Sequence, residues 1–160
     1  MTLDRKDFAL IQALQENASR RLEDLAKLVG LAPSSVHDRL RRLERLGIIQ
    51  GWTIKLDTSA LGLGILAFIG ISLSRPCSEL IDALRPISAI EECHSTAGRL
   101  SLLLKVRVRD PASLVELLER LRKIPGIEQT ESTIVLKSQI ERPISLKELV
   151  GAVKTHEISR

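Results

Sequence analysis

Two short amphipathic segments joined by a tight turn constrain this chain more than any other feature of its sequence. Residues 22–29 carry leucine and valine on one side and charged residues on the other, and Gly30 ends this segment because glycine reaches the left-handed conformation without steric cost. The second segment begins at Pro33, a residue suited to the first position of a helix, and extends to about Leu46. Another amphipathic segment, from Asp4 to Ala18, precedes both, so the segment that begins at Pro33 is the third helix of the chain. Together they predict a helix-turn-helix domain at residues 1–56.

The segment that starts at Pro33 is predicted to be basic on its outer side. Val36, Leu40 and Leu43 form its apolar stripe, so its four arginines are expected to face solvent. The forked donors of arginine suit phosphate oxygens and guanine edges, so we expect the segment to contact double-stranded DNA. A solvated charged face is the alternative for an isolated helix, but the tight turn and the preceding helix favour DNA binding through the major groove. The candidate DNA-contacting residues are Ser34, Ser35, His37, Asp38, Arg39, Arg41, Arg42 and Arg45.

A β-rich segment follows this helix. Residues 48–56 are rich in β-branched side chains and alternate over their second half, which predicts a strand and therefore a winged helix-turn-helix. Trp52 is interpreted as a packing residue of this strand rather than as a base-stacking one. The short polar stretch that begins at Asp57 is interpreted as a linker over residues 57–63.

The rest of the chain predicts an α+β domain at residues 64–138. Strands are expected at 64–74, 90–96, 100–108 and 127–136, and helices at about 78–84 and 112–123, with Pro86 and Pro125 among the residues that separate them. This βαββαβ order is that of the ferredoxin-like fold, a sheet with helices on one face. The stretch 144–153 within the carboxyl-terminal tail, residues 139–160, is either a closing helix or an interaction tail.

Several of these residues resemble the Lrp/AsnC family of bacterial and archaeal regulators, along nearly the whole chain. The most specific match is the string Gly47-Ile48-Ile49-Gln50-Gly51-Trp52 with Leu61-Gly62, and Leu25-Ala26 through Pro33-Ser34 resembles the family's helix-turn-helix. The resemblance implies a sequence-specific transcriptional regulator whose carboxyl-terminal part is a ferredoxin-like RAM domain. Ala32 stands where the family commonly has a serine helix cap, so the start of the third helix is expected to lack a side-chain cap.

The resemblance also implies a ligand-binding loop of the form Gly-x-x-Asp before the third strand. Here the loop is Gly98-Arg99-Leu100-Ser101, in which serine replaces the aspartate that would meet an α-ammonium group. We expect that the protein either senses an atypical small molecule or responds to none. The candidate effector-binding residues are Gly98, Arg99, Ser101, Thr130, Ser132 and Thr133.

Self-association is expected because helices cover only one face of a ferredoxin-like sheet. The first and third strands are strongly apolar, so the second face is predicted to pair with another copy of the chain. The resemblance to the Lrp/AsnC family also implies a dimer, and it implies that dimers assemble into tetramers or octamers.

Other classes of protein receive little support. The net charge is only +4, so bulk charge does not decide the partner. The apolar run 61–73 is shorter than the roughly 18 residues that a membrane span needs, and no signal peptide is evident, so we expect a cytoplasmic protein without a membrane partner. Cys77 and Cys93 form no disulfide framework and no zinc motif. No metal site, cofactor site or catalytic set is predicted.

Two alternatives remain open at this point. The sirohaem decarboxylases resemble the same family by fold, but His37, His94 and His156 show no arrangement that suits a tetrapyrrole enzyme. The other alternative is a RAM-type ligand-binding or assembly protein that does not bind DNA, and the basic third helix argues against it.

Overall fold

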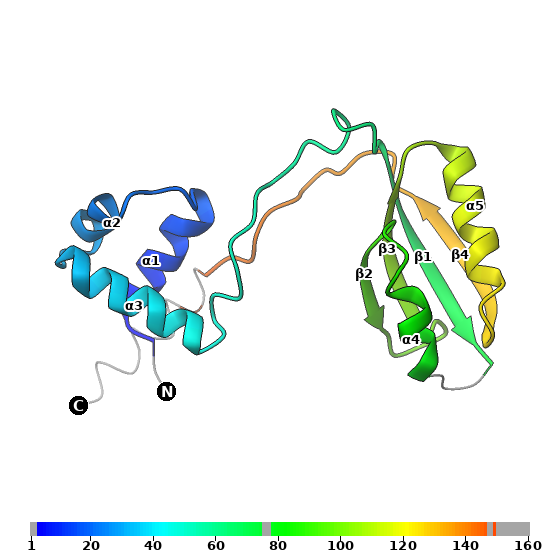
Figure 1. Ribbon diagram of the computed structural model, residues 1–160, viewed down its shortest axis with the longest axis horizontal. Coiled ribbons are helices and arrows are strands. Elements are labelled where there is room, and N and C mark those ends of the chain that lie inside the picture. Colours follow the sequence, from blue (N-terminus) through cyan, green and yellow to red (C-terminus); the bar gives the residue numbers. More distant parts are fainter. Residues whose placement is uncertain (1–2, 75–77, 147–148, 150–160) are drawn as a thin grey trace. The chain divides into compact units, whose positions relative to one another are not determined.

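The computed structural model describes residues 3–74, 78–146 and 149, and the chain divides into two compact units. One unit comprises Met1–Ile54 together with Glu141–Arg160, and the other comprises Lys55–Ile140. Figure 1 shows three helices in the first and a sheet with two helices in the second. Among the described residues, no helix is long and apolar enough to cross a membrane.

The first unit contains α1 (Arg5–Glu16), α2 (Leu22–Val29) and α3 (Pro33–Arg45), as the apolar periodicity predicts. Asp4 caps α1 through a reciprocal capping box with Asp7, which satisfies two backbone N–H groups at the helix start. Gly30 ends α2 with φ of 61°, the conformation expected of the tight turn. The core of this unit joins all three helices, and its buried members are Leu10, Ala13, Leu14, Leu25, Ala26, Val29 and Val36.

The helix α3 begins as the sequence predicts, without a side-chain cap. Ala32 is the N-cap residue and offers no hydrogen bond to the first turn, while Pro33 occupies the first helical position. The apolar stripe of α3 is also as predicted, since Val36 and Leu43 are fully buried and Leu40 packs against the core.

The predicted wing strand at residues 48–56 is wrong. In the described part of the chain every strand lies at or beyond Ile65, and residues 50–57 have no regular secondary structure. A strand requires a neighbouring strand to pair its backbone N–H and C=O groups, and the helical unit supplies none. Trp52 is half exposed rather than packed, and its indole N–H donates to Glu44 at 3.2 Å.

The second unit has the predicted βαββαβ order: β1 (Ile65–Leu73), α4 (Ser78–Leu84), β2 (Ile90–Ser95), β3 (Leu102–Val108), α5 (Pro111–Arg122) and β4 (Ile127–Ile134). The sheet order is β2-β3-β1-β4, and all three strand pairs are antiparallel. This topology confirms the ferredoxin-like expectation.

The two faces of this sheet differ. Alternate residues of β1 and β3, among them Ile69 and Leu104, point toward α4 and α5 and are fully buried with Leu121. Figure 1 shows that both helices lie over this one face. The other face, which we call the open face, carries the intervening side chains of the same strands. Leu66, Phe68 and Leu103 are its partly exposed apolar members on β1 and β3.

The segments that flank the second unit are irregular. Asp57 accepts from the backbone N–H groups of Ser59 and Ala60, which forms a turn at the predicted linker. Residues 139–146 have no regular secondary structure, and most of the predicted tail helix at 144–153 lies outside the described residues. Leu146 is buried, whereas Ile144 is exposed.

Candidate functional site

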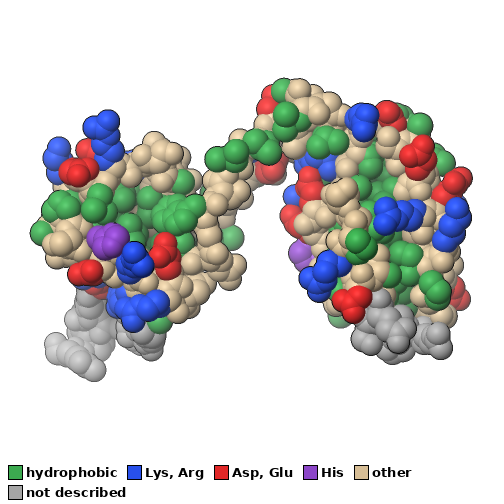
Figure 2. Space-filling model, in the orientation of Figure 1, with side chains coloured by type: hydrophobic (Ala, Val, Ile, Leu, Met, Phe, Trp, Pro, Cys, Tyr) green, Lys and Arg blue, Asp and Glu red, His purple; other side chains and the backbone are tan. Residues whose placement is uncertain are grey.

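The helix α3 exposes a row of polar side chains on the side opposite its apolar stripe. Six of the eight predicted DNA-contacting residues are exposed, and their side chains form no hydrogen bond or ion pair within the part of the chain that the structure describes. These residues are Ser34, Ser35, His37, Asp38, Arg41 and Arg45. Figure 2 shows basic side chains mixed with acidic and apolar ones on the visible face of the helical unit. The candidate surface therefore depends on individual side chains rather than on a uniform basic patch.

Arg39 and Arg42 do not face solvent freely, in contrast to the sequence prediction. Their guanidinium groups bind the carboxylate of Asp7 on α1, with N–O distances of 2.8 Å for Arg39 and 2.5 Å for Arg42. Arg39 also binds Asp4 at 2.6 Å. The side chains of Arg39 and Arg42 are 27% and 34% exposed, and that of Asp7 is fully buried. These two arginines connect α3 to α1.

Asp7 completes its hydrogen bonds inside the unit. Besides the two arginines, its carboxylate accepts from the backbone N–H of Asp4 at 3.0 Å. A buried carboxylate is tolerated only when it is paired and hydrogen-bonded, and Asp7 meets both conditions. Sequence analysis missed this residue. The available signal was a charged residue on the apolar stripe of α1, three positions before Leu10 and seven before Leu14.

The contacts between Asp4, Asp7 and Arg39 shift the pKa values of Asp4 and Arg39. Burial acts to raise the pKa of Asp4, but the hydrogen bonds from the Asp7 backbone N–H and from Arg39 outweigh it, so the pKa of Asp4 is lowered. The hydrogen bonds to Asp4 and Asp7 raise the pKa of Arg39. Both shifts favour the ionised forms, so the connection between α1 and α3 stays charged at neutral pH.

The predicted effector loop lies between β2 and β3. Gly98 has φ of 137°, a conformation that disfavours any side chain there. Arg99 forms an ion pair with Glu131 on β4, so the positive charge of the loop is already matched within the chain. The Ser101 hydroxyl accepts from the backbone N–H of Leu73 at 3.3 Å, which fixes the loop to the end of β1.

The predicted hydroxyl residues of β4 do not gather on one side of the sheet. Thr130 and Ser132 pair with Ile71 and Ile69, whose side chains point toward the helices, whereas Thr133 pairs with Phe68 on the open face. Thr130 also accepts a hydrogen bond from Arg122 of α5 at 3.3 Å. Within one chain, therefore, the six predicted effector residues do not form a single pocket. Glu131, the partner of Arg99, was not predicted.

No alternative chemistry is evident in the described residues. They contain no group of three or more His, Cys, Asp or Glu side chains that could hold a metal ion. Cys93 is a free cysteine on the surface, and partial burial of its thiol raises the pKa, so less of it is thiolate at neutral pH than in an ordinary cysteine. His94 faces Glu92 at 3.0 Å.

Comparison with protein families accounts for both units. A family model described as the AsnC-type helix-turn-helix domain matches residues 3–44, and one described as the Lrp/AsnC ligand binding domain matches residues 66–144. The first match covers α1, α2 and nearly all of α3, and the second covers the ferredoxin-like sheet except Ile65, the first residue of β1.

Individual relatives agree with this assignment. The chain is 34% identical to the HTH-type transcriptional regulator FL11 of Pyrococcus horikoshii over 87% of this chain and 93% of that protein. It is 36% identical to the leucine-responsive regulatory protein of Escherichia coli over 84% of this chain and 85% of that protein. Among solved structures, it resembles E. coli AsnC with a TM-score of 0.82 and 31% identity, covering 90% of this chain and 99% of that one. A transcriptional regulator from Neisseria meningitidis, solved with L-Met, matches with a TM-score of 0.85 and 28% identity, covering 92% and 99%. The chain therefore belongs to the Lrp/AsnC family of transcriptional regulators.

Proposed function

We propose that this regulator binds double-stranded DNA by placing the amino end of α3 in the major groove. The observation that carries the proposal is the exposed row of α3, which follows the tight turn at Gly30 and contains Arg41 and Arg45 without partners in the described residues. Arg41 and Arg45 supply phosphate contacts, and Ser34, Ser35, His37 and Asp38 lie early enough on the helix to reach base edges. Arg39 and Arg42 act mainly by holding α3 against α1.

The test is a mobility-shift titration on the DNA upstream of the protein's own gene. Replacing Arg41 and Arg45 together by alanine should weaken binding to all DNA sequences at least tenfold, because phosphate contacts carry no sequence information. Replacing Ser34 should instead change the preference among sequences. The matched control replaces Arg85 and Lys123, two basic residues of the other unit, and should bind as the parent does. Equal binding by all variants would contradict the assignment of α3.

We further propose that two chains pair through their open faces. Leu66, Phe68, Leu100 and Leu103 are partly exposed at or beside the centre of this face. Ion pairs flank them on both sides, Lys105 with Glu92 at 2.9 Å and Arg99 with Glu131. An apolar centre with a charged rim is the usual anatomy of a protein interface.

Light scattering tests this pairing. Leu103→Glu places a charge in the apolar centre and should shift the protein toward monomer, whereas Val115→Glu, at an exposed position of α5, should leave the assembly unchanged. A parent protein that is monomeric at micromolar concentration would refute the proposal. Assembly into tetramers or octamers would show as a larger mass in the same measurement.

The proposed ligand response rests on the loop before β3. The Neisseria relative was solved with L-Met, but Ser101 and the ion pair of Arg99 leave no free carboxylate in this loop for an α-ammonium group. We therefore propose that the protein responds to an atypical effector or to none. We also propose that it is a cytoplasmic regulator and not an enzyme. Calorimetry against the twenty common amino acids tests this, and millimolar or tighter binding of a common neutral amino acid would contradict it. The family's named regulators favour this role over the decarboxylase alternative.

A further inference from the structure

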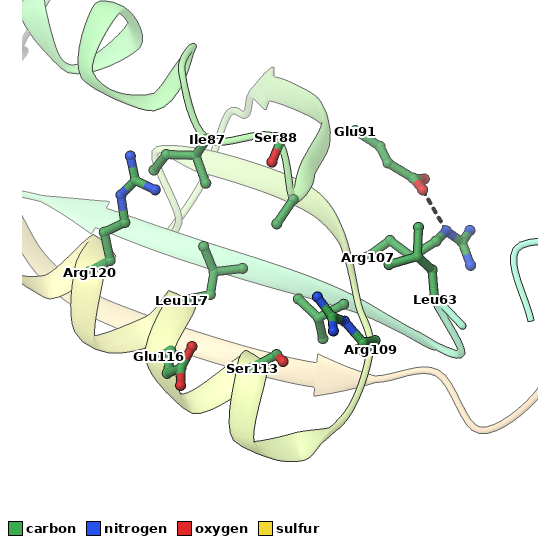
Figure 3. A pocket seen from close by; sticks show the side chains of 12 residues that line it. Leu63, Ile87, Ser88, Glu91, Arg107, Arg109, Ser113, Glu116, Leu117 and Arg120 are labelled. Carbon is green, nitrogen blue, oxygen red and sulfur yellow. Dashed lines mark hydrogen bonds and ion pairs between the residues drawn. The ribbon is translucent and has the colours of Figure 1, made fainter. Parts of the chain in front are cut away.

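A cavity lies in the ferredoxin-like unit, away from the loop before β3. It has a volume of about 490 Å³ and is lined by α5 from Ser113 to Arg120, residues 87–89, Glu91 of β2, the end of β3 and Leu63 (Figure 3). Because β3 runs from Leu102 to Val108, the loop of Gly98 and Ser101 precedes the start of the strand while the cavity adjoins its end. None of the six predicted effector residues lines it.

The floor of this cavity is apolar. Leu117 lies between the other lining side chains in Figure 3, and both Leu117 and Ile87 belong to the buried core. Leu63, which is 37% exposed, lines the cavity as well. A volume near 500 Å³ is far larger than an inorganic ion needs and falls within the range of small-molecule pockets. The cavity therefore suits an organic molecule with an apolar portion.

Two unpaired arginines border this floor. Arg109, which follows β3, and Arg120 of α5 lie on opposite sides of Leu117, with the guanidinium of Arg120 beside Ile87 (Figure 3). Within the described residues, neither guanidinium forms an ion pair or hydrogen bond. The third arginine, Arg107, is already occupied, since it binds Glu91 at 2.5 Å and the Thr58 hydroxyl at 3.0 Å.

The acidic residues near the cavity do not cancel these two charges. Glu91 is held by Arg107. Asp110 does not line the cavity and accepts from the backbone N–H of Ser113 as the N-cap of α5; this hydrogen bond, together with the charge of the neighbouring Arg109, lowers the pKa of Asp110. Three arginines and two glutamates line the cavity, and Glu116 is the lining glutamate that forms no hydrogen bond or ion pair within the described residues. The cavity therefore keeps an excess of positive charge beside an apolar floor.

We propose that this cavity binds a small organic acid, either a carboxylate or a phosphate ester, that carries an aliphatic portion. The acid group pairs with one of the two arginines, whose planar donors match carboxylate and phosphate oxygens, and the aliphatic portion covers Leu117, which lies between them. This site is separate from the loop of Arg99 and independent of the DNA contacts proposed for α3. It gives this domain a place, outside the loop of Arg99, at which a metabolite of acidic character binds.

The test uses displacement of the fluorescent dye anilinonaphthalene sulfonate, an apolar anion, from the full-length protein. Hexanoate and hexyl phosphate should displace the dye, and hexylamine, of the same chain length and opposite charge, should not. The double variant Arg109→Gln with Arg120→Gln should bind the displacing acid at least tenfold more weakly, because one charge-assisted contact is worth roughly a factor of ten or more in affinity. Whichever of the two acids displaces the dye at lower concentration identifies the acid group that the site prefers.

Two further variants separate the cavity from other surfaces. The control double variant Arg85→Gln with Lys123→Gln removes the same charge outside the cavity and should bind as the parent does, as should Arg99→Gln in the loop before β3. Ser88→Leu narrows the cavity without changing charge and should also weaken binding. Equal displacement from the parent and from the Arg109 and Arg120 double variant would overturn the proposal, as would displacement by hexylamine at the same concentration as hexanoate.

Discussion

Replacing Asp7 by asparagine tests whether the buried carboxylate holds α3 against α1. Asparagine keeps the shape of the side chain and one acceptor oxygen, so it leaves no cavity, but it removes the negative charge that both arginines bind. Arg39 donates to one oxygen of Asp7, and Arg42 and the backbone N–H of Asp4 donate to the other, so asparagine replaces one of these acceptors by an NH2 group that cannot accept. At least one arginine contact is then lost, and a hydrogen bond to a charged group contributes about 1.5–3 kcal/mol. Arg39 and Arg42 are about one-third exposed, so water compensates in part. We expect a loss of about 2 kcal/mol in the free energy of unfolding.

Urea denaturation followed by tryptophan fluorescence provides the assay. Trp52 is the single tryptophan of the chain, belongs to the helical unit and donates to Glu44 on α3, so its emission reports the unfolding of that unit. In a thermal measurement, 2 kcal/mol corresponds to a decrease of about 10 °C for a unit of this size.

Glu16→Gln is the matched control for this variant. It also removes a carboxylate from α1, but Glu16 is 58% exposed and pairs only with the partly exposed Arg20 at 2.9 Å. Such surface pairs contribute about 0.5 kcal/mol or less. The reasoning is refuted if Asp7→Asn and Glu16→Gln lower the stability equally, because burial of the carboxylate would then make no difference.

Three other predictions concern stability. Ala32→Ser should raise the free energy of unfolding of the helical unit by about 1 kcal/mol, because the serine oxygen can accept an N–H of the first turn of α3; an unchanged urea midpoint would mean that the cap position is already satisfied. Leu104→Ala, at a fully buried position of β3, should cost about 2–5 kcal/mol in the sheet unit, measured by circular dichroism, and a loss below 1 kcal/mol would contradict the described core. The hydrogen bond from Lys105, with that from His94, lowers the pKa of Glu92. The stabilisation from these contacts is therefore complete above the unfolded-state pKa and is lost as the pH falls below about 4.5 through the lowered folded-state pKa. Glu92→Gln should flatten this acid dependence in a pH series of denaturation curves, and an unaltered slope would exclude the contribution.

The sequence predicts the regular elements of this protein closely because their signals are local. The alternation in β3 gives the buried and partly buried pattern along Leu102–Val108, and the three- and four-residue steps in α3 give the buried Val36 and Leu43. The turn at Gly30 follows from the conformational freedom of one residue.

The features that the sequence did not predict depend on residues far apart in the chain. The wing strand at 48–56 has suitable side chains, but a strand forms only where another strand pairs with it, which local alternation does not reveal. Arg39 and Arg42 look like solvent-facing cations on a helical wheel, yet their partner Asp7 lies 32 and 35 residues earlier. The side of the sheet occupied by Thr133 depends on its register with Phe68, which sequence reasoning did not assign.

The internal pairing of Arg39 and Arg42 has a consequence for the counterions of the DNA. Each phosphate neutralised by a free cation releases condensed counterions, so the logarithm of the binding constant falls with the logarithm of salt concentration by about 0.9 per contact. If all four arginines of α3 met phosphates, one protomer would contribute a slope of about 3.6, but with Asp7 occupying two of them the expected contribution is about 1.8. In the binding mode that we propose for α3, Asp7 thus makes DNA binding less sensitive to ionic strength than the four arginines of this helix suggest.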